Sequence, residues 1–359
     1  CISFLEDTGY MSRAAFMMDR LMHLMGLHGK SFIPLIMGTG CNVPAVQATR
    51  TIESRTDRFI TILVAPLVSC SARLQVFILI AGTFFRPVQA ALAIIALHIL
   101  GFGLAMVMGK LLRLTLFRGE TTPFVMELPP YRMPVLKATV IHMWEKGRLF
   151  LTRAGTVILA GATLVWFLSH YPGITNKAWV AERQGQEQAI HALKLAPADE
   201  KGKLEELDLS SESRIMNSSL AARFGHLLQP ALAPILDPDH KRPEAWKDGV
   251  ALTAGFVAKE IVVSTMGVVN QAKAENAADT PGLSPLQQTL KQNSGFTPLT
   301  SFAFMVFILL YTPCLGLVGM ILKETRSLAW TGFSVGYGLV LAWIMAWGTV
   351  NLGRLLGFV

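Results

Sequence analysis

The sequence has few charged residues for its length, and this scarcity argues against a soluble protein. Asp, Glu, Lys and Arg make up 16% of the 359 residues, whereas soluble domains carry roughly 25%. Hydrophobic residues reach 52%, and the mean hydropathy is +0.45. A chain of this composition is expected to lie mostly within a membrane.

Cysteine is also scarce, and its spacing excludes several redox and metal folds. The chain has four cysteines and no CxxC pair, so neither a zinc ribbon nor a thioredoxin-type site is predicted. No HExxH motif is present, which leaves an enzyme with little support. The stretch GLHGKS resembles the end of a phosphate-binding loop, but Leu24 stands where that loop needs its first glycine, so we interpret the stretch as a connector.

The net charge of +8 does not indicate nucleic-acid binding, because the basic residues cluster in short loops beside apolar stretches. Such clustering is typical of the cytoplasmic side of membrane proteins. It places Thr49–Arg58, Lys110–Arg153 and Lys323–Arg326 in the cytoplasm. The chain opens with Cys in a helical pattern, and we interpret it as a fragment that lacks an N-terminal part.

We predict an all-α fold, a polytopic membrane helix bundle with two interrupted, re-entrant gate segments that form inverted repeats. The sequence divides into five regions: a first gate region with the transmembrane helices after it (1–112), a basic cytoplasmic loop (113–148), a transmembrane helix (149–171), a polar extracytoplasmic region (172–247), and a second gate region with the C-terminal transmembrane helices (248–359).

The first interrupted segment is Phe32–Ala48, which is too short and too broken for a plain membrane span. In lipid, a broken helix is tolerated only where it is buried in protein or lines a cavity. The break therefore predicts a polar path. The residues that mark this break or could line it are Gly38, Gly40, Cys41, Asn42 and Pro44.

A second polar stretch lies inside the predicted span Phe59–Phe85 and contains Ser69, Cys70, Ser71 and Arg73. A charged arginine near mid-membrane costs at least ~2.5 kcal/mol unless it is paired or hydrated. Arg73 therefore needs a partner, and the candidates are Glu6, Asp7 or carbonyl groups freed at the break. A purely structural pair that fixes helix packing is the alternative to a role in an ion path.

The later half repeats this pattern. Asp248–Gly267 is the second interrupted segment, in which Gly255 is predicted to break the helix and Lys259 and Glu260 are embedded. Cys314 follows Pro313 within the predicted span Thr300–Leu322. Interrupted segments at comparable places in two halves indicate a transporter with internal repeats.

The three embedded cysteines favour a soft or borderline metal ion, because thiolates select Fe(II), Zn(II) or Cu(I) over alkali and alkaline-earth ions. Acidic groups such as Glu6 or Asp7 could face the same path. The alternative is that these cysteines are small apolar residues of the packing, which is common in membrane proteins.

Several long motifs resemble the ferrous iron transport protein B family. They are LEDTGYMSRAAFMMDRLMHLMGLHGKSFIPL, GCNVPAVQATRTIESRTDR, APLVSCSARL, DGVALTAGFVAKEIVVSTM, and YTPC before KETR. The resemblance implies Fe(II) uptake across the bacterial inner membrane by a multi-pass protein. It also implies an N-terminal GTPase domain, outside this chain, that binds GTP and Mg, and as partners the lipid bilayer, small cytoplasmic Feo proteins and further copies of itself.

The same resemblance assigns roles to individual residues. Cys41 and Cys70 match the gate cysteines, and Cys314 matches a late cysteine. In the second gate the matching residues are Gly255, Lys259 and Glu260. One departure follows SCSARL, where this chain has Gln75, Val76 and Phe77 instead of the family's Pro-Val-Tyr, which puts any role of that proline or tyrosine in doubt.

These observations lead to a hypothesis in which Fe(II) meets Cys41 and Cys70 with Asn42 and freed carbonyls. Glu6, Asp7 and Glu260 offset its charge, and movement of the interrupted segments is the gate. Two other classes stay open. A nucleoside-type transporter would be indifferent to thiol loss, and a redox-sensing membrane receptor would carry no flux.

Overall fold

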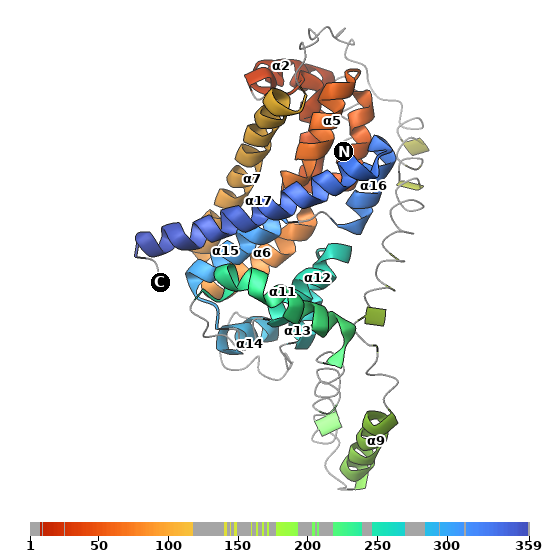
Figure 1. The fold of residues 1–359 in the computed structure, drawn as a ribbon, viewed down its shortest axis with the longest axis vertical. Helices are drawn as coiled ribbons and strands as arrows, with labels where there is room; N and C mark the ends of the chain where they lie inside the picture. The colour runs from red at the N-terminus through yellow and green to blue at the C-terminus, as the bar shows by residue number, and fades with distance from the viewer. Residues whose placement is uncertain are drawn as a thin grey trace. The chain divides into compact units, whose positions relative to one another are not determined.

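The computed structural model describes residues 10–24, 26–117, 177–192, 218–238, 246–269, 284–293, 295–311 and 314–357, with isolated positions elsewhere. Throughout these ranges the regular structure is helical (Figure 1), which confirms the predicted all-α fold. Glu6 and Asp7 lie outside the described residues, as do most of the predicted loop 113–148 and helix 149–171 and part of the polar region 172–247. The division into five regions stays a prediction.

The helices fall into two sets along the chain. The first set is α2 (Tyr10–Leu24), η1 (Gly29–Ser31), α3 (Phe32–Gly40), α4 (Asn42–Ala48), η2 (Thr49–Thr51), α5 (Arg55–Val64), η3 (Ala65–Leu67), α6 (Ser71–Phe84) and α7 (Pro87–Thr115). The second set is α9 (Lys177–Ala192), α11 (Leu220–Leu236), α12 (Trp246–Val257), α13 (Ile261–Val269), α14 (Pro285–Asn293), α15 (Pro298–Leu310), α16 (Leu315–Thr325) and α17 (Leu328–Leu355).

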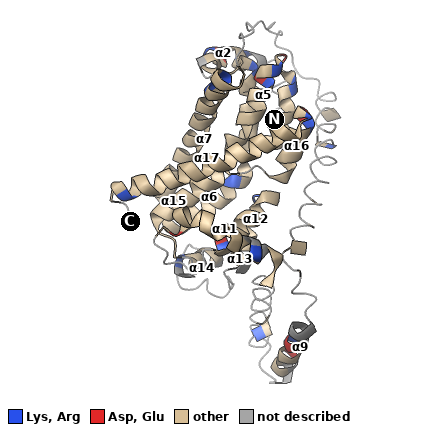
Figure 2. Ribbon diagram, in the orientation of Figure 1, with Lys and Arg blue, Asp and Glu red and all other residues tan. Residues whose placement is uncertain are grey.

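Four stretches of the described residues are long and apolar enough to cross a membrane, as the polytopic prediction requires. They are Arg55–Phe84, Pro87–Thr115, Pro298–Thr325 and Leu328–Leu355. Figure 2 shows the charged residues on the same ribbon, and α7 and α17 carry charge only in their last two turns. These two helices have the composition that lipid contact requires.

The two interrupted segments appear as pairs of short helices. The first pair, α3 and α4, is separated by Cys41, as the sequence predicts. The second pair, α12 and α13, is separated by residues 258–260. The prediction that Gly255 breaks this segment is wrong, because Gly255 is a buried residue inside α12 and the break comes three residues later. A re-entrant path through the membrane and an inverted relation between the repeats both stay predictions.

Contacts divide the chain into two units. Unit 1 comprises Cys1–Leu74, Ile94–Leu159 and Phe307–Trp343, and unit 2 comprises Gln75–Ala93, Ala160–Val306 and Ile344–Val359. The first gate segment belongs to unit 1 and the second to unit 2. Within unit 1, α4 packs on α16. The apolar side chains between these helices and α5 form one core cluster, composed of Val43, Val46, Ile62, Ala65, Leu317, Met320 and Ile321.

Within unit 2, α11 crosses α12 at a point where two glycines meet. A methyl group added to Gly225 would lie 2.9 Å from the carbonyl oxygen of Trp246 and 2.7 Å from Val250 Cγ2. On the other helix, a methyl group at Gly249 would lie 3.1 Å from the Gly225 carbonyl oxygen. The two backbones can approach this closely only because neither residue has a side chain.

We therefore expect Gly225→Ala to destabilise unit 2 by about 1–3 kcal/mol, the usual cost of overpacking a tight contact. The matched control is Gly332→Ala in α17, where an added methyl group meets nothing within 4 Å. Thermal unfolding in detergent should separate the two, with a lower midpoint for Gly225→Ala and an unchanged or higher one for the control. Equal midpoints would contradict close packing at this crossing.

Candidate ion-binding site at the interrupted helices

Cys41 stands at the break between α3 and α4 with an extended backbone, at φ −154° and ψ 128°. Its amide closes α3 by donating to the Met37 carbonyl at 3.0 Å. Pro44 falls in the first turn of α4, where its missing N–H would have no helical partner anyway. The local sequence thus ends one helix and begins the next at Cys41, which is half-buried.

Asn42 ties this break to a second one. Its Nδ2 donates to the Val68 carbonyl at 3.1 Å, in the extended stretch between η3 and α6. Gly38 makes room for this side chain, because a methyl group at Gly38 would lie 2.8 Å from Asn42 Oδ1. Ser71 joins the same two breaks, since its Oγ donates to the Gly40 carbonyl at 2.7 Å.

Arg73 is fully buried, at 1% exposure, and it points back at the second break. Its Nη1 donates to the carbonyls of Pro66 and Val68 at 2.9 and 3.1 Å. Of the partners considered from the sequence, the freed carbonyls are therefore the ones the structure records. The Val68 carbonyl accepts from both Asn42 and Arg73, so it links the break at Cys41 to the α6 helix that follows the second break.

The three embedded cysteines share one placement, because each stands directly before a helix. Cys41 precedes α4, Cys70 precedes α6 and Cys314 precedes α16. All three are half-buried and free of disulfides. Cys41 and Cys314 pack against the same core cluster between α4 and α16. The structure therefore places two of the three predicted thiols beside one apolar cluster of unit 1.

Three polar atoms around the two breaks are buried without a hydrogen-bond partner: Asn42 Oδ1, Ser69 Oγ and Arg73 Nε. Buried polar atoms are nearly always paired, so unpaired ones call for an explanation. The two oxygens are potential ligands for a cation that has lost its water. The described residues contain no ready-made cluster of three or more His, Cys, Asp or Glu side chains.

The second gate lies in unit 2, and two of the residues at its break are charged. Lys259, at 3% exposure, is buried in the turn between α12 and α13, whereas the neighbouring Glu260 is exposed. The residues predicted for the path are thus divided between two units. The structure brings together the first-gate residues, and it does not describe Glu6 or Asp7.

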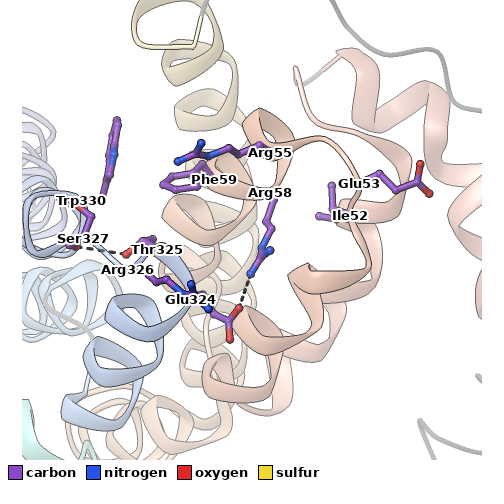
Figure 3. Close-up of a pocket in the computed structure, with 10 residues that line it drawn as sticks. All are labelled: Ile52, Glu53, Arg55, Arg58, Phe59, Glu324, Thr325, Arg326, Ser327 and Trp330. Carbon is purple, nitrogen blue, oxygen red and sulfur yellow. Dashed lines mark hydrogen bonds and ion pairs between the residues drawn. The ribbon is translucent and has the colours of Figure 1, made fainter.

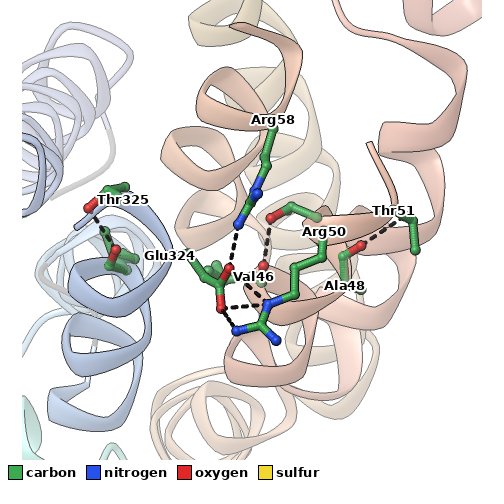
Figure 4. Close-up of polar contacts among 9 residues, drawn as sticks. Val46, Ala48, Arg50, Thr51, Arg58, Glu324 and Thr325 are labelled. Atoms are coloured by element: carbon green, nitrogen blue, oxygen red, sulfur yellow. Dashed lines mark hydrogen bonds and ion pairs between the residues drawn. The ribbon is translucent and has the colours of Figure 1, made fainter. Parts of the chain in front are cut away.

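A charged cluster next to the first gate was not predicted from the sequence. Arg50 and Arg58 converge on Glu324 (Figure 4). Arg50 donates through Nε and Nη2 at 2.5–3.0 Å, and Arg58 Nη2 donates at 2.6 Å. The Glu324 side chain is only 2% exposed. The hydrogen bonds that Arg50 donates to Glu324 raise the pKa of Arg50 above its usual value, which favours the charged form of its guanidinium.

The cluster joins segments that the sequence assigns to the cytoplasmic side. Arg50 and Arg58 come from Thr49–Arg58, and Glu324 comes from Lys323–Arg326. A further ion pair, Arg113 to Asp57 at 2.7 Å, brings in the end of α7. The only available signal was the shared cytoplasmic assignment. It predicted a common side of the membrane but could not predict which charges meet.

Comparison with known proteins gives two family matches. The family described as "Gate: Nucleoside recognition" matches residues 1–84 and 151–328. The family described as "Ferrous iron transport protein B C terminus" matches residues 94–146. No solved structure matches this chain.

Three curated relatives illustrate the similarity. The Fe(2+) transport protein A/Fe(2+) transporter FeoB fusion protein of Porphyromonas gingivalis is 43% identical over 99% of this chain and 41% of its own length. For the Fe(2+) transporter FeoB of Helicobacter pylori the values are 37%, 95% and 51%. For that of Staphylococcus aureus strain COL they are 36%, 99% and 45%. The chain spans about half the length of these relatives.

The fold and the gate match define a polytopic helical membrane protein with gate segments. Its similarity to the named relatives extends over nearly the whole chain, at 36–43% identity. The chain belongs to the ferrous iron transport protein B (FeoB) family.

Proposed function

We propose that this chain is the membrane permease portion of a ferrous iron transporter and that it carries Fe(II) into the bacterial cell. The observation that carries the proposal is the identity of at least 36%, across almost the entire chain, to proteins named Fe(2+) transporter FeoB. The geometry of the first gate supports it, because two breaks with half-buried thiols are bridged by Asn42 and Ser71.

In this proposal Fe(II) approaches the two breaks from outside and exchanges water for protein ligands. Cys41 and Cys70 supply thiolates, and Asn42 Oδ1 and Ser69 Oγ supply oxygens that lack partners. Cys314 lies at the same core cluster as Cys41 and offers a further sulfur. Mixed soft and hard ligands suit Fe(II) better than Mg²⁺ or Ca²⁺. Glu6, Asp7 and Glu260 would offset the charge of the ion along its path.

The rest of the assembly is proposed from the family. A GTPase domain that binds GTP and Mg²⁺, located outside this chain, would drive or license the gate, and the site of action would be the bacterial inner membrane. One relative is named as a fusion of Fe(2+) transport protein A with FeoB, which supports a small cytoplasmic Feo protein as partner. Further copies of the chain are a second proposed partner.

The test is anaerobic Fe(II) flux into proteoliposomes that contain the full-length protein, supplied with GTP. We expect Cys41→Ser/Cys70→Ser to lower the initial rate by about tenfold or more, because a hydroxyl replaces a preferred soft ligand at two positions. The matched control is Cys1→Ser, a thiol outside the gate segments. Its flux should equal that of the wild type.

The outcomes are distinct. Loss of flux in the double variant alone supports a cysteine-lined path. Equal flux in wild type and double variant keeps the transporter and moves the ion to oxygen ligands. A wild-type protein without Fe(II) flux would overturn the proposed function.

A second candidate function rests on the family description "Nucleoside recognition". Helices interrupted by polar breaks can also hold an organic solute. The same liposomes, loaded in parallel with radiolabelled uridine, separate the two candidates. Uridine uptake that is insensitive to thiol loss, in the absence of Fe(II) flux, would favour the nucleoside transporter.

A further inference from the structure

A cavity of about 630 Å³ lies at the end of unit 1 that carries the Glu324 cluster (Figure 3). Its lining includes three arginines, Arg55, Arg58 and Arg326, together with Phe59 and Trp330. The proposed ion path does not use it. This lining suits a ligand in which an anionic group stands next to an apolar one.

The charges around the cavity leave an excess of cations. Two carboxylates also line it, but both are already engaged, Glu53 with Lys30 at 2.6 Å and Glu324 with Arg50 and Arg58. Within the described part of the chain, no ion pair is recorded for Arg55 or Arg326, and both residues are exposed. The Arg55 guanidinium lies 5.6 Å from the Phe59 ring centroid, so it is held at the cavity wall.

Arg326 occupies an unusual backbone position. It caps α16 with φ at +51°, in the left-handed region where helices normally place glycine or asparagine. A side chain with a Cβ costs about 1–2 kcal/mol in this conformation. Strain of this kind is retained where the side chain has a use, and the use available to Arg326 is its charge at the cavity.

The cavity lies at the level where apolar spans end. The spans begin or end at Arg55, Thr115, Thr325 and Leu328, all within unit 1. An adjoining cavity of about 240 Å³ shares Arg55, Phe59 and Trp330 and adds Phe117. The three rings touch, since Phe117 and Trp330 stack at 5.2 Å between centroids and Phe59 lies 5.8 Å from Trp330. Aromatic groups at this depth are typical of the lipid headgroup boundary.

From this arrangement we propose that the cavity binds the phosphate group of an anionic phospholipid. The phosphate lies between Arg55, Arg326 and the outer edge of Arg58, and the glycerol end of the lipid lies against Phe59, Phe117 and Trp330. The first turns of α5 and α17 border the cavity, and the positive ends of these helix dipoles favour an anion there. Basic pockets between transmembrane helices on the cytoplasmic side are suited to this chemistry.

The adjoining cavity, which is lined by aromatic rings, favours a lipid over a soluble phosphate. An inorganic phosphate or a sugar phosphate would bind the arginines and leave the adjoining cavity empty. A phospholipid fills both cavities and reaches them along the membrane surface. The proposal is independent of the ion that the protein carries.

The experiment measures the thermal unfolding midpoint of the full-length protein in detergent as dioctanoyl phosphatidylglycerol is titrated in. We expect the midpoint to rise with this lipid and to rise less with dioctanoyl phosphatidylcholine or glycerol 3-phosphate. In Arg55→Gln/Arg326→Gly the apparent affinity for phosphatidylglycerol should fall by about tenfold or more, since each surface arginine contributes roughly 1 kcal/mol. Glycine suits the backbone at position 326, so this variant should fold.

The matched control is Arg86→Gln, an exposed arginine between α6 and α7 that does not line the cavity. It should bind phosphatidylglycerol like the wild type. Unchanged affinity in the double variant would overturn the proposal, as would equal stabilisation by phosphatidylcholine. Equal stabilisation by glycerol 3-phosphate would also overturn it and would assign the cavity to a soluble phosphate. If the double variant does not fold, Arg55→Gln alone must still weaken binding, and Arg55→Lys must weaken it less.

Discussion

Replacing Arg50 and Arg58 together with methionine is expected to lower the free energy of unfolding by about 3–5 kcal/mol, as for other buried charges left without a partner. Glu324 is the reason, because its side chain is 2% exposed and its recorded ion pairs are to these two arginines. The double variant leaves a carboxylate that is largely shielded from water and has lost both recorded cationic partners. Unfolding by SDS titration in mixed micelles measures the loss.

A mutant cycle separates a missing partner from a general loss of packing. In the triple variant Arg50→Met/Arg58→Met/Glu324→Met the buried charge is gone, so most of the lost stability should return. Glu324→Gln alone should cost less than the arginine pair, because the side chains of Arg50 and Arg58 are 47% and 30% exposed and can be hydrated. A triple variant no more stable than the double would show that Glu324 is not the source of the loss.

Arg73→Met is expected to lower Fe(II) flux by about tenfold or more and to cost roughly 1–3 kcal/mol of stability, the usual effect of an unpaired buried acceptor. Arg73 is 1% exposed and donates to the Pro66 and Val68 carbonyls, which flank the break before Cys70. Without it, the Pro66 carbonyl loses its recorded side-chain donor and the position of Cys70 is less fixed. Flux in proteoliposomes and thermal unfolding measure the two effects.

Two variants control for this result. Arg73→Lys keeps the charge but loses the guanidinium geometry, so its flux should be intermediate. Arg86→Met removes an exposed arginine elsewhere and should leave flux and stability unchanged. A positioning role also predicts that Arg73→Met alters the preference for Fe(II) over Mn(II). Wild-type flux and selectivity in Arg73→Met would remove this residue from the gate.

The sequence predicted the parts of the first gate that depend on local rules. Glycine and proline around Cys41 predicted a helix break at that residue, and the structure places it there. A buried arginine needs acceptors, and the broken backbone near Val68 is what the structure supplies to Arg73. The first prediction follows from the low helix propensity of glycine and proline, and the second from the cost of leaving polar groups unpaired in lipid.

The incorrect and missing predictions depend on tertiary packing. Gly255 did not break its helix, because a buried glycine is tolerated inside a helix that tertiary packing holds, and the turn came at Lys259 and Glu260. The partners Arg50 and Glu324 are 274 residues apart, and charge patterns predict a side of the membrane rather than a pair. The arginine-lined cavity depends on Arg326 and Trp330 meeting α5, which periodicity along the chain does not reveal.

The short helix α4 is tied to neighbouring segments by hydrogen bonds near both of its ends. At one end Asn42 holds the Val68 carbonyl, and just beyond the other end Arg50 holds Glu324. Seven helical residues span only about 10 Å, and a helix that short is far stiffer than the hydrogen bonds at its ends. We therefore expect α4 to move as one rigid body. A shift of α16, which carries Glu324, would then also displace Asn42 at the break that contains Cys41.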